Sequence, residues 1–194
     1  MQLHDSILIL NGIAWDDYVT NIKAIANESK SRSSYYQEIV EIMSPGRNHE
    51  TIKENIALLV VAYCDTREID YTPTGSMTIK NEEIKVAKEP DTSFIFSEDA
   101  ENPELAVEVN YSSGGVNDLE RYLALKVREV WLWDKNDTLV FFVLDNGSYK
   151  ETSNSYFFPE LESETIQKYV KLMLAGNTRI VKRNFIGELK NVAS

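Results

Sequence analysis

The sequence has few of the residues from which many catalytic and structural sites are built. Its 194 residues include one cysteine, Cys64, and two histidines, His4 and His49. A single cysteine excludes an internal disulfide and a cysteine-based zinc cage, and Cys64 lies in an apolar helical pattern where it is expected to pack in the core. With only these two histidines, the sequence does not indicate a Ser-His-Asp triad.

Long hydrophobic runs are also missing. No apolar stretch approaches the roughly 20 residues that span a membrane. The first residues, MQLHDSILIL, have no basic segment ahead of the apolar one, so we expect no signal peptide. The sequence therefore predicts a cytoplasmic protein without a membrane partner.

Positive charge is the minority sign, with 20 Lys and Arg against 31 Asp and Glu and a net charge of −11. Nonspecific affinity for nucleic acid comes mostly from Lys and Arg on phosphates, so a general nucleic-acid coat protein is excluded. Local binding through a basic patch or a metal ion remains open. Gly114-Gly115 lacks the spacing of a phosphate-binding loop and is interpreted as a turn between a strand and a helix.

Hydrophobic spacing predicts a mixed α/β fold over residues 1–194, with one sheet covered by helices. We take 1–14 as an N-terminal extension and 177–194 as a C-terminal helical tail. Helical periodicity indicates helices over 15–28, 47–67, 116–126 and 163–176. Ser163 is expected to cap the last of these, and Gly176 to end it.

Alternating patterns and turn residues predict the strands. A hairpin near 33–43 is expected to turn at Gln37-Glu38, and a second hairpin at Asp145-Asn146-Gly147. The remaining strands are expected near 71–80, 88–96, 105–111 and 128–134.

Two carboxylates occupy strands that should be apolar. Asp91 opens PDTSFIF, and Glu108 follows 17 positions later in LAVEVNY, so two adjacent strands could place them side by side. Glu41 is a third acidic residue in a strand pattern. Clustered carboxylates repel one another unless a cation binds them, and an all-oxygen site favours Mg²⁺ or Mn²⁺. The alternative is that each carboxylate simply lies on a solvent face.

Several motifs, in order, resemble one family. They are YYQEIVEIMSP, RNHETIKENI, GSMTI, EPDTSFIF, LAVEVNYSSGGVNDLERYLALKVREVWLWD and LVFFVLDNGSY, spread between about Trp15 and Tyr169. Together they resemble the Uma-two family, a bacterial family catalogued as restriction endonucleases and similar to the PD-(D/E)XK nuclease superfamily. The resemblance implies a restriction-endonuclease-like core with a mixed sheet flanked by helices. It also implies Mg²⁺-dependent hydrolysis of phosphodiester bonds, with DNA the expected substrate.

The same resemblance implies roles for particular residues. Asp91 and Glu108 match the metal-binding carboxylates, with the backbone carbonyl of Val109 as a neighbouring ligand. Glu41 matches a further acidic ligand. His49 and, beside it, Arg47 are the expected substrate contacts, although polar residues at a helix start are often merely solvated.

A lysine is missing where the resemblance places one. The expected positions are two residues after Glu108, which is Asn110, and the start of the next helix, which is Asp118. Such a lysine orients the attacking water and offsets charge in the transition state. Arg121 shares a helix face with Asp118 and could offset phosphate charge, but it is a poor base, and Lys126 is about 12 Å further along the helix. An altered or impaired site is therefore expected, with Asp118 as a further metal ligand the second interpretation.

A catalytically inactive module of the same fold is the alternative function, favoured by the missing lysine and the acidic charge. A homodimer through the hairpin near 128–144 or the C-terminal helix is a further expectation, because two-fold dimers are the commonest oligomers.

Overall fold

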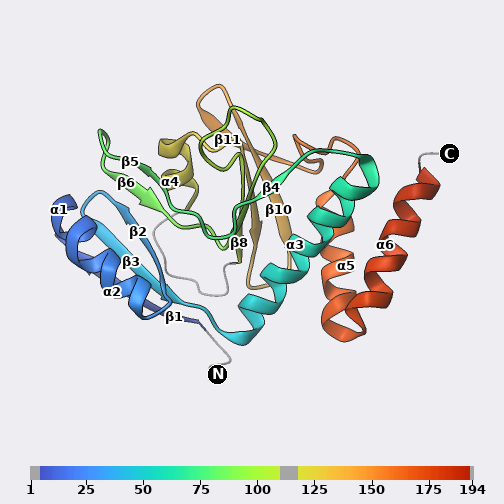
Figure 1. The fold of residues 1–194 in the computed structure, drawn as a ribbon, viewed down its shortest axis with the longest axis horizontal. Coiled ribbons are helices and arrows are strands. Elements are labelled where there is room, and N and C mark those ends of the chain that lie inside the picture. Colours follow the sequence, from blue (N-terminus) through green and yellow to red (C-terminus); the bar gives the residue numbers. More distant parts are fainter. Residues whose placement is uncertain (1–4, 110–117, 193–194) are drawn as a thin grey trace.

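The computed structural model describes residues 5–109 and 118–192 and contains two β-sheets with helices packed around them (Figure 1). The first, sheet I, is antiparallel throughout and has the order β1-β3-β2-β6-β5. Its strands are β1 (Ser6–Asn11), β2 (Arg32–Tyr36), β3 (Ile39–Ser44), β5 (Ile79–Asn81) and β6 (Val86–Lys88). The expected hairpin is confirmed as β2 and β3, joined by Gln37 and Glu38 at positive φ.

One face of sheet I is covered by the predicted N-terminal helix. It runs as α1 (Trp15–Asp17), the π-helical turn η1 (Tyr18–Ile22) and α2 (Lys23–Glu28). Tyr18 packs there with Tyr35, Val40 and Ala87, one residue from each of three neighbouring strands. Because side chains alternate along a strand, the residues beside these point to the opposite face.

The second sheet, sheet II, has the order β11-β10-β9-β8-β7-β4. Its strands are β4 (Thr72–Pro73), β7 (Thr92–Ile95), β8 (Leu105–Val109), β9 (Glu129–Trp133), β10 (Leu139–Asp145) and β11 (Ser148–Thr152). Among the strands of the described residues, only β8 and β9 pair in parallel, with helix α4 (Asp118–Leu125) between them in the chain. The predicted turn at residues 145–147 is confirmed, since Asn146 and Gly147 both have positive φ.

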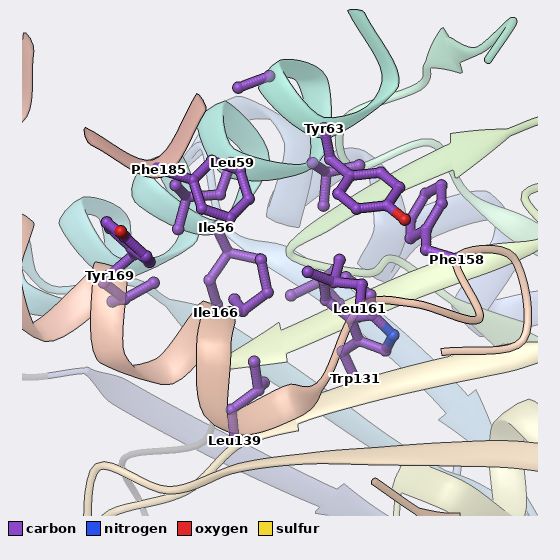
Figure 2. Packing of buried hydrophobic residues seen from close by; sticks show 14 of the residues in the cluster. Ile56, Leu59, Tyr63, Trp131, Leu139, Phe158, Leu161, Ile166, Tyr169 and Phe185 are labelled. Carbon is purple, nitrogen blue, oxygen red and sulfur yellow. The ribbon is translucent and has the colours of Figure 1, made fainter. Parts of the chain in front are cut away.

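The main core lies between one face of sheet II and three helices, α3 (Arg47–Arg67), α5 (Ser163–Ala175) and α6 (Thr178–Val192). Figure 2 shows Trp131 and Leu139 of the sheet facing Ile56 and Tyr63 of α3 and Ile166 of α5. Cys64 is buried in this core, as predicted. A smaller cluster on the other face packs α4 against Ala106 and Val130 and reaches Ile79 of sheet I.

The predicted fold class, a mixed α/β fold flanked by helices, is confirmed, but the expectation of one sheet is wrong. The chain enters sheet II at β4, returns to sheet I for β5 and β6, and enters sheet II again at β7. Pro90, which lacks an N–H for a ladder, lies between β6 and β7. The strand expected over 71–80 is divided between β4 of sheet II and β5 of sheet I, and the strand expected over 88–96 is divided between the end of β6 in sheet I and β7 in sheet II.

Two details of the helices bear on the sequence predictions. The predicted cap at Ser163 is wrong, because Ser163 is the first helical residue of α5, and Glu162 precedes it without a side-chain capping bond. The backbone N–H of Ser163, like other first-turn N–H groups, has no acceptor within the helix and donates to the carbonyl of Ser153. Gly176 does end α5, as predicted. No helix within the described ranges has the length and apolar character needed to cross a membrane.

Candidate active site

A row of polar side chains crosses the face of sheet I that points away from the N-terminal helix. The strand register places Glu41 of β3 opposite Ser34 of β2, and Ser34 opposite Lys88 of β6. The neighbouring row, which includes Tyr35 and Ala87, faces the apolar cluster, so this row must face the other way. Glu41 and Lys88 thus lie on the two strands that flank β2, one on each side of Ser34.

Glu108 lies on β8, which is buried along its whole length. The strand's odd-numbered residues pack in the main core, so Glu108 points to the side of α4. There the hydroxyl of Tyr122 donates a hydrogen bond to the Glu108 carboxylate. The ammonium nitrogen of Lys88 lies 3.1 Å from the same carboxylate oxygen. Glu108 is therefore not on a solvent face but joins sheet II, α4 and sheet I.

Asp91 is held by a different set of partners. Its Oδ2 accepts a 2.7 Å hydrogen bond from the backbone N–H of Val109, which ties the start of β7 to the end of β8. Its Oδ1 lies 2.9 Å from both Arg32 Nη1 and His49 Nε2. Burial raises the pKa of Asp91, but the hydrogen bond and charge of His49 and the charge of Arg32 outweigh it and lower the pKa below its ordinary value.

His49 is enclosed between two carboxylates at the start of α3. Its Nδ1 lies 3.1 Å from Asp5, and its Nε2 faces Asp91. Burial lowers the pKa of His49, but its interactions with the Asp5 and Asp91 carboxylates, through hydrogen bonding and negative charge, reverse that effect and raise the pKa to about 9. The imidazole is accordingly a cation at neutral pH.

Asp118, the first residue of α4, faces two cations. Its Oδ1 is 2.9 Å from Lys88 Nζ and 2.9 Å from Arg121 Nη1. Arg121 is fully buried, and its Nη2 lies 3.6 Å from Glu41 Oε2. The charges of β3, β6 and α4 thus form one network in which acidic and basic groups alternate.

A pocket opens where these elements meet. Charged residues and serines make up most of its lining, which comprises Asp5, Ile7, Arg32, Ser33, Ser34, Glu41, Met43, Lys88, Glu89, Glu108, Val109 and Asp118. About 30 Å³ is accessible to the centres of water-sized molecules. A water needs roughly 10–15 Å³ by this measure, so the pocket has room for an ion or a few waters but not for a whole nucleotide.

Burial and neighbouring charges together set the pKa values of Glu108 and Lys88 in the pocket. Burial raises the pKa of Glu108 to about 8, although the charge of Lys88 opposes the shift, and Asp91 and Asp118 add to it. Burial lowers the pKa of Lys88, but Asp118 and Glu108 outweigh it, and the result lies above the ordinary value. Lys88 is therefore positively charged throughout the physiological range.

Residues 15–174 match the family Uma2, described as "Putative restriction endonuclease". The chain belongs to the Uma2 family. The match covers most of the sequence and confirms the resemblance drawn from the motifs. No curated protein matches the chain.

Among solved structures, the chain is similar to one described as a putative nuclease belonging to DUF820 from Anabaena variabilis. The two are 14% identical, with a TM-score of 0.49, and the match covers 71% of this chain and 90% of the other.

The structure brings together some of the residues that the Uma2 motifs indicated. Glu41, Glu108, Val109 and Asp118 line one pocket, and Asp91 adjoins it through its bond to Val109. Other residues lie apart from the lining. His49 is 1% exposed beneath Asp91, Arg121 is buried behind Asp118, and Arg47 is exposed in the first turn of α3. Asn110 and the Gly114-Gly115 turn lie outside the described residues.

Three residues of the site were missed in the sequence. Lys88 lies in a three-residue strand, and a lysine in a strand ordinarily indicates a solvent face. Its importance depends on pairing with Ser34, 54 positions earlier, which no local pattern reveals. Arg32 and Asp5 were missed for the same reason, since their partners Asp91 and His49 are distant in sequence. The one available signal in the sequence was that Lys88 lies two positions before Pro90-Asp91.

Proposed function

We propose that this Uma2 protein is a metal-dependent nuclease that hydrolyses phosphodiester bonds of nucleic acid, with DNA as the expected substrate and Mg²⁺ or Mn²⁺ as the metal. The observation that carries the proposal is the convergence of Glu41, Glu108 and Asp118 with Lys88 on one small pocket, from four different elements. Family membership supports the reaction class.

The charge of the pocket supports a metal ion. Five acidic and two basic side chains line it, so its lining carries excess negative charge. Glu41 Oε2 is buried and lacks a hydrogen-bond partner among the described residues, although the Arg121 guanidinium lies nearby. Each of these features is what a divalent cation would relieve.

The donor set fits a hydrated ion better than a closed cage. No group of three Asp, Glu, His or Cys residues in 5–109 and 118–192 surrounds a common point as metal ligands would. Mg²⁺ commonly takes one or two carboxylates and keeps several waters, so a full cage is not needed. We propose Glu108 and the Val109 carbonyl as the nearest ligands, with Glu41 across the pocket and Asp91 in support. A bound metal would acidify a water and offset phosphate charge.

The other residues then serve to position these groups. Asp91 fixes the backbone at Val109, and Arg32 and His49 balance the charge of Asp91. Tyr122 orients the Glu108 carboxylate through its hydroxyl. Arg121 supports Asp118 and Glu41 from behind rather than touching phosphate, because it is fully buried. Of the two predicted substrate contacts, Arg47 is exposed at the start of α3 and is the one accessible to the substrate backbone.

One observation favours the second candidate, a non-catalytic module. Each of Asp91, Glu108 and Asp118 already has a positively charged neighbour within 3.1 Å. Protein cations can therefore stabilise the cluster in place of a metal. In that case, the pocket would be a structural ion network, and the fold would act through binding or assembly. A homodimer, which light scattering would detect, belongs equally to either candidate.

The test is nicking of supercoiled plasmid in Mg²⁺ or Mn²⁺, with EDTA as the metal-free control. Glu108→Gln keeps the shape of the side chain and removes its charge. Glu83→Gln, an exposed change in the turn between β5 and β6, is the matched control. We expect metal-dependent nicking by wild type and by Glu83→Gln, and a loss on the order of 100-fold in Glu108→Gln.

Two outcomes separate the candidates. Equal nicking by Glu108→Gln and wild type would show that this pocket is not the active site. Absence of nicking in wild type, together with no calorimetric binding of Mn²⁺, would favour the non-catalytic module.

A further inference from the structure

Lys88 is the cation best placed to act in the pocket. Arg32 also lines it, but its guanidinium is committed to Asp91 at 2.9 Å and to Glu50 at 2.7 Å. The ammonium of Lys88 lies 3.1 Å from Glu108 and 2.9 Å from Asp118. An ammonium group has three N–H donors. Within residues 5–109 and 118–192, two carboxylates contact the Lys88 ammonium, so one donor is left for another acceptor in the pocket.

The strand register explains why this ammonium reaches the pocket. β6 pairs with both β2 and β5, so its backbone is held on both sides. Ala87 faces the apolar cluster under the N-terminal helix, which directs Lys88 to the opposite face. That face lies against α4, which contacts β6 directly. The lysine is thus positioned by a fixed strand rather than by a loop.

Lys88 of β6 lies where a lysine was expected at position 118, and Asp118 contacts its ammonium. The residue at 118 is an aspartate where the motif resemblance led us to expect a lysine, and the ammonium approaches the same place from sheet I. Asp118 also contacts Arg121, so it is anchored on α4. An aspartate at this position is therefore not simply a lost charge, because its carboxylate holds the ammonium of Lys88 beside Glu108.

We propose that Lys88 binds a non-bridging oxygen of the phosphodiester to be cleaved and that Asp118 positions it. This inference rests on the proposed nuclease function. Hydrolysis adds one water across a P–O bond, with hydroxide joining phosphorus and a proton joining the leaving oxygen. Lys88 keeps all its protons in that reaction. Its charge stabilises the non-bridging oxygen, where negative charge develops in the transition state.

The competing explanation is that Lys88 is only a counter-ion for two buried carboxylates. Both explanations predict that removal of the ammonium disturbs Glu108 and Asp118. The two explanations differ in what they predict for DNA binding, because only a contact between Lys88 and phosphate changes the salt dependence of the affinity. Each phosphate that a protein neutralises contributes about 0.7 to the slope of log affinity against log salt for single strands and about 0.9 for duplex DNA.

The experiment compares wild type with Lys88→Met, and uses Lys80→Met as the control. Lys80 is on the neighbouring strand β5, and its side chain is half exposed beside Glu82. Two quantities are measured: nicking of plasmid in Mn²⁺, and binding of an unmodified DNA duplex over a range of salt in EDTA, which removes the metal needed for hydrolysis. We expect Lys88→Met to nick on the order of 100-fold more slowly and to lose about one unit of salt slope, with Lys80→Met unchanged.

A second comparison covers the case in which Lys88→Met alone does not fold. The double variant Lys88→Met/Asp118→Asn removes both charges of the pair and is compared with Asp118→Asn. A lower salt slope in the double variant than in Asp118→Asn supports the phosphate contact, and equal slopes overturn it.

The outcomes distinguish this inference from the function on which it rests. Nicking by wild type, with the same rate and salt slope in folded Lys88→Met, would overturn the role of Lys88 and leave the nuclease proposal intact. Failure of wild type both to nick and to bind the duplex would overturn the nuclease proposal itself, and this inference with it.

Discussion

The stability of the protein should fall as pH rises through the titration of His49. Its two ring nitrogens face Asp5 at 3.1 Å and Asp91 at 2.9 Å, and the side chain is 1% exposed. A carboxylate beside each ring nitrogen favours the protonated imidazole, in which both nitrogens carry a proton. The pKa of His49 is raised from an ordinary value of 6.5 to about 9 in the folded protein. That difference corresponds to about 3 kcal/mol of stability, at 1.36 kcal/mol per pKa unit.

The sign follows from the direction of the shift. Below pH 6.5, both folded and unfolded chains carry the proton, and the full contribution is present. Above that pH, the unfolded chain releases its proton first, so the contribution declines and is lost as pH passes about 9. Burial raises the pKa of Glu108 to about 8, so its contribution to the free energy of unfolding also declines over an overlapping pH range. The pH dependence of wild type alone therefore does not isolate the contribution of His49.

The assay is urea unfolding at pH 6 and pH 9.5, in EDTA, for wild type and for His49→Gln. The Glu108 contribution is common to both proteins and largely cancels in the comparison. Wild type should lose about 3 kcal/mol more than the variant between the two pH values. Equal losses in both proteins would refute the assignment of a buried imidazolium to His49.

Three further predictions concern other parts of the fold. Glu129 is fully buried and accepts hydrogen bonds from Trp131 Nε1 and from the backbone N–H groups of Tyr156 and Phe157. Glu129→Ala should therefore lower the free energy of unfolding by about 2–4 kcal/mol. A loss below about 0.5 kcal/mol in urea unfolding would contradict this role. Burial raises the pKa of the Cys64 thiol to about 12, so native protein should react with iodoacetamide at pH 8 on the order of 100-fold more slowly than unfolded protein, and equal rates by mass spectrometry would refute its burial. Gly147 has a φ of 82°, and an added Cβ would meet nothing within 4 Å, so Gly147→Ala should cost only the backbone strain, about 1 kcal/mol, in thermal unfolding.

Local patterns in the sequence predicted most of the individual elements. The 47–67 helix and the hairpin at Gln37-Glu38 appear where periodicity and turn residues placed them. These elements depend on residues close together in the chain. The adjacency of β7 and β8, which joins Asp91 to the backbone of Val109, was likewise predicted from spacing and a single intervening turn.

Features that depend on distant pairing could not be predicted in the same way. The division into two sheets depends on β6 joining β2, and a strand pattern does not specify its partner. Lys88 was missed because only this pairing directs it towards Glu108. From the sequence, Asp118 was therefore interpreted as the loss of the expected lysine, whereas in the structure its carboxylate contacts the ammonium of Lys88.

Location of the metal ion tests the central claim most directly. Crystals grown with Mn²⁺ should show an anomalous difference peak at the manganese edge inside the pocket, in contact with the Glu108 carboxylate and the Val109 carbonyl. The same crystals of Glu108→Gln should lack it. A pocket without a peak at saturating Mn²⁺, with Lys88 still paired to Glu108 and Asp118, would contradict a metal-dependent active site between the two sheets.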